Sequence, residues 1–114
     1  MSLQHEVNCL INAIQESSQY KNYKKTRLDL LQDEELTKKV NEFRKQRLLL
    51  ESRTVANNYP ANELKAVQEL YSSLRSNYLA SSFLDAEREL TEMILNIYKE
   101  IGEALDFYLD FLNQ

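Results

Sequence analysis

A histidine and the only cysteine of the chain stand four residues apart near its beginning. Side chains at this spacing are neighbours on a helix, so His5 and Cys9 could offer a metal ion two ligands. A structural or catalytic zinc site uses three or four protein ligands, and the sequence has no other His or Cys. The pair also falls opposite the apolar positions Leu3, Val7 and Leu10. We therefore predict a polar outer face without a metal; the alternative is a site shared across a subunit interface.

The rest of the sequence contains few motifs that are typical of catalytic or cofactor sites. Glycine occurs once, at Gly102, and proline once, at Pro60, and no glycine-rich phosphate-binding pattern is present. Di-metal carboxylate sites in helical bundles use Glu-x-x-His pairs, and the sequence contains none. Nothing near Cys9 and His5 marks a third orienting group or a preorganised oxyanion site. We predict a protein without enzymatic activity, catalytic residues or a cofactor.

One segment, residues 20–27, interleaves aromatic with basic residues. Its basic members are Lys21, Lys24, Lys25 and Arg27, and Tyr20 and Tyr23 lie between them. Such a patch could hold phosphates and stack unpaired bases of RNA, or it could meet an acidic protein partner. The alternative is structural: the tyrosines face the core and the lysines form a solvated face. The four basic residues are therefore a candidate surface for binding a protein partner or RNA.

Long helices must position these residues, because tight turns need the glycine and proline that this chain lacks. Apolar residues recur at spacings of three and four, which predicts amphipathic helices. The predicted helices cover residues 3–15, 18–32, 34–53, 61–79 and 83–112. Asp33 is the predicted N-cap of the third helix and Ser82 that of the fifth, and residues 54–60 form the predicted loop. The fold class is all-α: a bundle of about five helices with a long C-terminal helix, in a single domain over residues 1–114.

The heptad spacing puts two charged residues at core positions. Arg47 follows Leu36, Val40 and Phe43 on the third helix, and Glu87 follows Phe83 on the fifth. A buried charge is costly unless it is paired. One hypothesis is therefore that Glu87 and Arg47 meet as a pair that fixes the register of the bundle. In the other, each side chain reaches solvent at the edge of the core.

The end of the predicted fifth helix is unusually apolar. Its large side chains cover more of the helix surface than a core-facing stripe needs, which favours association. We predict a homo-oligomer, a dimer, with an interface made by Leu105, Tyr108, Phe111 and Leu112. The alternative is that the first helix packs over this end and completes the core.

Charge and hydropathy limit the setting in which the protein works. The net charge is -4, with a basic middle and an acidic end, which disfavours nucleic-acid binding by bulk charge. No apolar run approaches the roughly 18 residues of a membrane helix, and the N-terminus lacks the pattern of a signal peptide. A single cysteine suits a reducing compartment. We expect a cytoplasmic protein that has no membrane contact.

Several of these residues together resemble the YlbF/YmcA family of Gram-positive bacteria. The resemblance is carried by Tyr20-x-x-Tyr23, by the cap Asp33-Glu34-Glu35 and the stripe through Phe43. It is carried most clearly by Phe83-x-x-Ala86-Glu87-x-Glu89-Leu90 and by Glu100-Ile101-Gly102. The likeness covers nearly the whole chain.

The resemblance implies an all-helical, oligomeric, cytoplasmic regulator without enzymatic activity. In that family, some members promote competence, sporulation and biofilm formation in a complex with sister proteins that adjusts an RNA-cleaving enzyme. The implied partners are thus family paralogues and such an enzyme. A cysteine-rich tail of the best-studied kind helps bind iron–sulfur clusters. With Cys9 as the only cysteine here, we expect no cofactor. A regulatory protein–protein interaction module is the first functional hypothesis, and RNA binding by the basic face around Lys21–Arg27 is the second.

Overall fold

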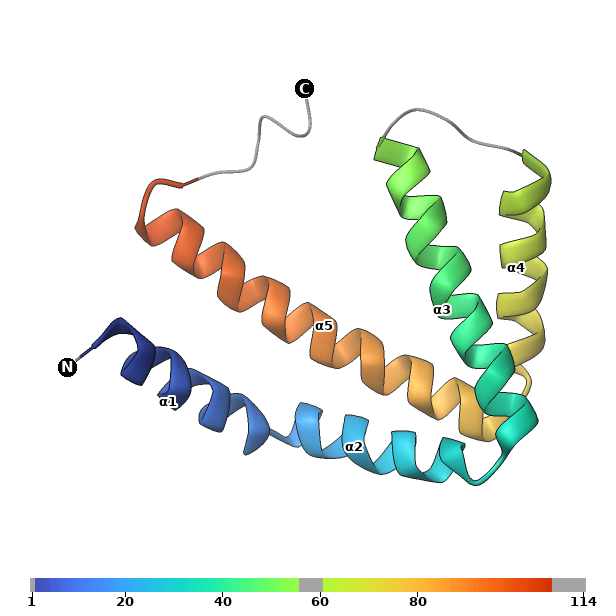
Figure 1. Ribbon diagram of the computed structural model, residues 1–114, viewed down its shortest axis with the longest axis horizontal. Coiled ribbons are helices and arrows are strands. Elements are labelled where there is room, and N and C mark those ends of the chain that lie inside the picture. The colour runs from blue at the N-terminus through green and yellow to red at the C-terminus, as the bar shows by residue number, and fades with distance from the viewer. Residues whose placement is uncertain (1, 56–60, 108–114) are drawn as a thin grey trace. The chain divides into compact units, whose positions relative to one another are not determined.

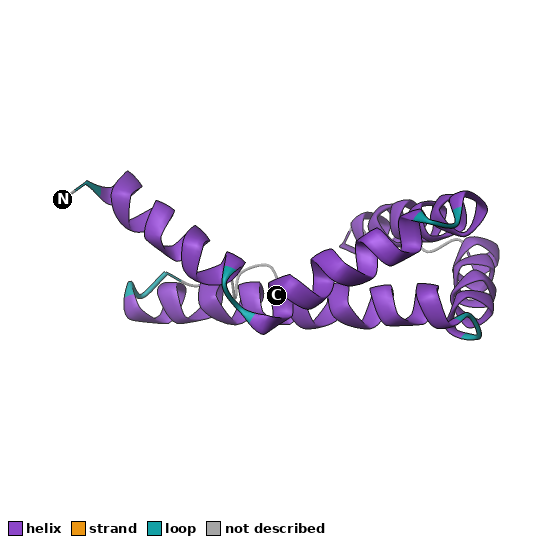
Figure 2. Cartoon of the chain, turned by 90° about the horizontal axis from the view of Figure 1, so that it is seen from below, coloured by secondary structure: helices purple, strands orange, loops and turns teal. Residues whose placement is uncertain are grey.

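Helices account for almost all of the chain that the structure describes. The computed structural model describes residues 2–55 and 61–107, and within these ranges it contains helices and no strand (Figures 1 and 2). The helices are α1 (Leu3–Gln15), α2 (Ser18–Leu31), α3 (Glu34–Val55), α4 (Ala61–Arg75) and α5 (Tyr78–Ala104). The predicted all-α class is confirmed.

The chain divides into two compact units. Unit 1 consists of Met1–Tyr23 and Asp85–Gln114, so it holds α1, the first turns of α2 and most of α5. Unit 2 is Lys24–Leu84, with the rest of α2, all of α3 and α4, and the first turns of α5. The single domain predicted for residues 1–114 stays a prediction.

The best-packed core lies in unit 2, where α3 and α4 run side by side (Figure 1). The three-and-four spacing of α3 buries Leu36, Val40 and Phe43, as predicted. The Phe43 ring lies 5.3 Å from that of Tyr71 on α4, between ring centroids. Such contacts between tilted aromatic rings stabilise a core beyond the burial of their area. The other buried apolar residues of this unit are Leu30, Val67, Leu74, Ala80, Phe83 and Leu84.

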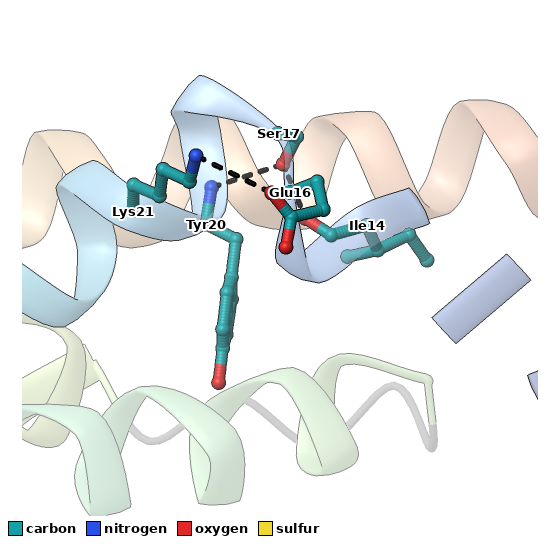
Figure 3. Close-up of polar contacts among 5 residues, drawn as sticks. All are labelled: Ile14, Glu16, Ser17, Tyr20 and Lys21. Carbon is teal, nitrogen blue, oxygen red and sulfur yellow. Dashed lines mark hydrogen bonds and ion pairs between the residues drawn. The ribbon is translucent and has the colours of Figure 1, made fainter. Parts of the chain in front are cut away.

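A serine separates α1 from α2 and caps the second helix. The Ser17 hydroxyl accepts a hydrogen bond from the Tyr20 amide at 3.1 Å and donates one to the Ile14 carbonyl oxygen (Figure 3). One side-chain oxygen thus satisfies a free amide at the start of α2. It also adds a second hydrogen bond to the Ile14 carbonyl oxygen, which accepts from the Ser17 amide at 3.0 Å. The interruption that the sequence predicts after residue 15 is therefore a capped junction.

Asp33 caps α3, as predicted. Its Oδ1 accepts a hydrogen bond from the Leu36 amide at 3.0 Å, and Glu34 and Glu35 follow in the first turn, where the helix dipole favours negative charge. The geometry is that of an N-cap residue bonded to the third amide of its helix.

Removing this cap is expected to lower the free energy of unfolding. Asp33→Ala should cost about 1 kcal/mol, the usual loss for an N-cap carboxylate, measured by urea denaturation followed by circular dichroism. Asp29→Ala is the matched control. Asp29 is exposed in the last turn of α2, where an acid opposes the dipole, so its loss should leave stability unchanged or slightly raised. Equal losses in the two variants would argue against capping.

The boundary between α4 and α5 differs from the prediction. Helix α4 ends at Arg75 rather than at residue 79, and α5 begins at Tyr78 rather than at residue 83. Asn77 is the N-cap of α5, since its Oδ1 accepts a hydrogen bond from the Ala80 amide at 3.2 Å. Ser82, the predicted cap, lies within α5. Asparagine is as strong a cap as serine, but the apolar spacing runs on through Tyr78 and hides the break.

Helix α5 also ends earlier than predicted, at Ala104 instead of residue 112. The Phe107 amide donates to the Gly102 carbonyl oxygen at 2.7 Å, and the Asp106 amide donates to that of Glu103 at 3.3 Å. Asp106 has a φ of 52°. This pair of bonds around a left-handed residue is the Schellman motif, which reverses the chain at a helix end. Glycine usually occupies the left-handed position of this motif, so the aspartate at this position does not indicate in the sequence that the helix ends. Residues 108–112 of the predicted helix lie outside the described residues.

The same reversal of the chain explains why residue 102 is a glycine. A Cβ placed on Gly102 would lie 2.6 Å from the Phe107 carbonyl oxygen, far closer than van der Waals contact. Alanine in a helix interior normally gains about 1 kcal/mol over glycine. Gly102→Ala should show no such gain and should instead raise the amide exchange rate of Phe107, measured by hydrogen exchange with NMR detection. A variant that gains this stability and keeps the Phe107 amide protected would contradict the contact.

Candidate interaction surface

The apolar stripe of α1 forms as predicted, yet it is not covered. Leu3 is 83% exposed, Val7, Leu10 and Ile11 are each more than a third exposed, and no residue of α1 is buried. We call Leu3, Val7, Leu10 and Ile11 the α1 strip. Side chains of this size gain stability when they leave water, so the α1 strip is a surface suited to a partner.

Helix α5 leaves a second strip exposed in the same unit. Its stripe begins in the core with Phe83 but emerges into solvent beyond Leu90. Ile94, Tyr98 and Ile101 are 45%, 48% and 47% exposed, and their spacing of four and three places them on one helix face. We call these three residues the α5 strip.

The predicted self-association interface is described only at its first residue. Leu105 lies just beyond the end of α5 and is 71% exposed. Tyr108, Phe111 and Leu112 lie outside the described residues, so the interface stays a prediction. The alternative, in which the first helix packs over this end, also stays a prediction, since Leu105 is the one residue of the interface that lies within the described residues.

The basic residues of α2 lie in solvent. Lys21, Lys24, Lys25 and Arg27 are exposed, whereas Thr26 is buried and Tyr20 and Tyr23 are half-buried. Lys21 Nζ lies 3.5 Å from Glu16 Oε2 (Figure 3), an exposed pair that holds little energy. The four basic residues therefore lie on one exposed stretch of α2, beside two half-buried tyrosines.

The other chemical candidates are the His5–Cys9 pair and the two charged core residues, Arg47 and Glu87. Cys9 Sγ lies 3.7 Å from His5 Nε2, and both residues are exposed. Among the described residues, no three His, Cys, Asp or Glu side chains gather in a way that could hold a metal ion. Glu87 is buried at 9% exposure, and the Arg47 guanidinium lies 5.3 Å above the centre of the Phe43 ring. The pairing of Glu87 with Arg47 stays a prediction.

A shallow hollow runs along α5 in unit 1. Its volume is about 640 Å³, and it combines two apolar side chains with three carboxylates and two amides. The lining residues are Gln19, Glu89, Glu92, Met93, Asn96, Ile97 and Glu100. We call it the acidic hollow. Ile97 lies one turn from both Ile94 and Ile101 on the helix, so the hollow borders the α5 strip.

Residues 3–106 match the family described as "Control of competence regulator ComK, YlbF/YmcA". The chain belongs to the YlbF/YmcA family. This confirms the resemblance seen in the sequence, and the regulatory character of the family agrees with a role in protein interaction.

Named relatives of this YlbF/YmcA protein extend over most of its length. A UPF0342 protein of Caldicellulosiruptor saccharolyticus is 30% identical over 98 residues, covering 85% of this chain and 82% of the relative. A UPF0342 protein of Symbiobacterium thermophilum is 27% identical and covers 90% and 92%. Among solved structures, a chain of Bacillus subtilis RicA in complex with RicF matches with a TM-score of 0.60 and 26% identity. That match covers 91% of this chain and 93% of the matched chain in the complex.

Two strips on this YlbF/YmcA protein were missed as surfaces by sequence reasoning. Residues Ile94 and Ile101 have the spacing of core residues, and spacing alone does not say whether the chain's other helices cover a stripe. The signal for exposed apolar residues was the length of α5, which is greater than the other helices can cover.

None of the described helices combines the length and the apolarity that crossing a membrane requires.

Proposed function

We propose that this protein is a non-enzymatic regulatory adaptor, which works by docking other proteins on the α1 and α5 strips. The observation that carries the proposal is the exposure of two apolar helix faces in one compact unit. Full burial of a Leu, Ile or Val side chain is worth roughly 1.5–3 kcal/mol, so half-exposed members of the strips retain about half of that for binding.

The partner we propose is another member of the same family. The similarity to a chain from the complex of Bacillus subtilis RicA with RicF supports a heteromeric assembly. Leu105, with Tyr108, Phe111 and Leu112, is proposed to make a separate self-contact that gives a dimer. The assembly would act in the cytoplasm on an RNA-cleaving enzyme, and so on competence, sporulation or biofilm formation.

RNA binding by α2 is the second candidate. It is favoured by the exposure of Lys21, Lys24, Lys25 and Arg27 on one short stretch of helix. Without aromatic side chains fully available for stacking, such a face would bind phosphates with little sequence preference.

One titration separates the two candidates. The full chain is titrated by calorimetry with a second YlbF/YmcA protein from the same cell, and separately with a single-stranded RNA oligonucleotide. We expect saturable binding of the protein, unchanged within twofold in the Lys24→Glu, Lys25→Glu double variant. Saturable RNA binding that the double variant abolishes, with no binding of the family protein, would instead support the RNA candidate and overturn the adaptor proposal.

A further inference from the structure

The described part of unit 1 is strongly acidic. Residues 2–23 and 85–107 hold nine Asp and Glu against three Lys and Arg. Two of the three basic side chains already form ion pairs with acids of the same unit: Lys21 with Glu16 at 3.5 Å, and Arg88 with Asp85 at 3.8 Å and Glu92 at 3.9 Å. The surface around the strips therefore presents a negative field to an approaching partner.

Part of this charge lies in the acidic hollow, which borders the α5 strip. In the acidic hollow, Met93 and Ile97 lie beside the carboxylates of Glu89, Glu92 and Glu100. An apolar strip bordered by one sign of charge is the arrangement by which helical interfaces choose their partners. The charge on this border should therefore decide what docks.

We infer that the occupant of the α5 strip is a protein helix whose own apolar stripe is bordered by Lys and Arg. The inference rests on the proposed docking function and adds the chemistry of the partner. A second copy of this chain docked on the α5 strip through its own α5 strip would bring two acidic hollows together, and like charges cost free energy at an interface. The phosphates of a nucleic acid would be repelled in the same way.

The size of the occupant follows from the spacing of the carboxylates. Glu89 and Glu100 are eleven residues apart on α5, a distance of about 16 Å along the helix axis. Three turns of a partner helix cover that length. A basic helix of this size could contact Ile94, Ile97 and Ile101 while its Lys or Arg side chains reach the glutamates.

The test uses two synthetic helical peptides of equal length. They share one Leu and Ile stripe, and they carry either Lys or Glu at the positions that flank it. Fluorescence anisotropy measures their binding to the full chain at low salt. We expect the Lys peptide to bind at least tenfold more tightly, since several exposed ion pairs at about 0.5 kcal/mol each give about this factor. The preference should shrink as salt rises.

Charge reversal shows whether the acidic hollow is responsible. Glu89→Lys with Glu100→Lys should remove the preference for the Lys peptide, a change of at least tenfold. The matched control, Glu51→Lys with Glu69→Lys, reverses two exposed glutamates of unit 2 and should change the preference less than threefold. If the two double variants reduced the preference equally, the preference would arise from the net charge of the chain and not from the acidic hollow, and the inference would be overturned. A wild-type dimer that the hollow variant dissociates would overturn it in favour of a second copy.

A third variant separates this inference from the proposed function. Ile94→Asp with Ile101→Asp should abolish binding of both peptides if the strip is the docking surface. If the strip variant abolishes binding but the hollow variant leaves the preference intact, the charge inference fails and the docking function stands. If the strip variant changes nothing, the docking function itself is wrong.

Discussion

The Ile101→Asp variant is expected to bind a family partner at least a hundredfold more weakly than the natural chain. Ile101 is half-exposed at the C-terminal end of the α5 strip, so docking would force the new carboxylate into an apolar contact. The lost burial of isoleucine and the desolvation of a charge together exceed about 2.7 kcal/mol, which is a hundredfold in affinity. Isothermal titration with the family protein measures the change.

A control variant shows whether any exposed apolar residue would give the same result. Leu48 is 67% exposed on α3 in unit 2, so Leu48→Asp makes the same chemical change away from the strips. It should leave the affinity within threefold. Both variants should keep their helical circular dichroism, because neither side chain is buried. If Leu48→Asp weakens binding and Ile101→Asp does not, docking occurs on unit 2.

The Phe83→Ala variant is expected to lose about 3–5 kcal/mol of unfolding free energy, the usual cost of removing a buried aromatic ring. Phe83 is 1% exposed and is among the largest fully buried side chains of the described residues. The Arg44 guanidinium lies 5.4 Å from the ring centre and would lose its cation–π contact as well. Urea denaturation followed by circular dichroism gives the value.

A milder change at the same position is the control for this loss. Phe83→Leu keeps most of the apolar volume and should cost clearly less than the alanine variant. Tyr78→Ala, at an 83% exposed residue of the same helix, should cost less than 1 kcal/mol, since surface changes are small. A loss below 1 kcal/mol for Phe83→Ala would mean that this part of unit 2 is not a packed core.

The sequence predicts well those features that depend on neighbouring residues. The stripe of Leu36, Val40 and Phe43 is buried, and the Asp33 cap has its expected hydrogen bond. Both follow from helical periodicity and from the chemistry of free amides at a helix start. The family resemblance also has a physical basis, because its residues Phe83, Ala86 and Glu87 are buried.

Other features could not be read from the sequence because they depend on distant packing or on unusual backbone. The break at Asn77 interrupts an apolar pattern that continues across it, and α5 ends on an aspartate, Asp106, in a conformation that glycine usually occupies. The exposure of Ile94 and Ile101 depends on which helices cover α5. Periodicity defines a stripe, but only packing decides whether the chain or a partner buries it.

Photo-crosslinking tests the docking account most directly. A photoreactive phenylalanine analogue is placed at Ile101 in one variant and at Leu48 in another, and each is irradiated in the presence of the second YlbF/YmcA protein. The account predicts that the Ile101 probe joins the partner, at a segment that mass spectrometry maps to a helix rich in Lys and Arg, and that the Leu48 probe does not. Crosslinks from Leu48 alone would contradict it.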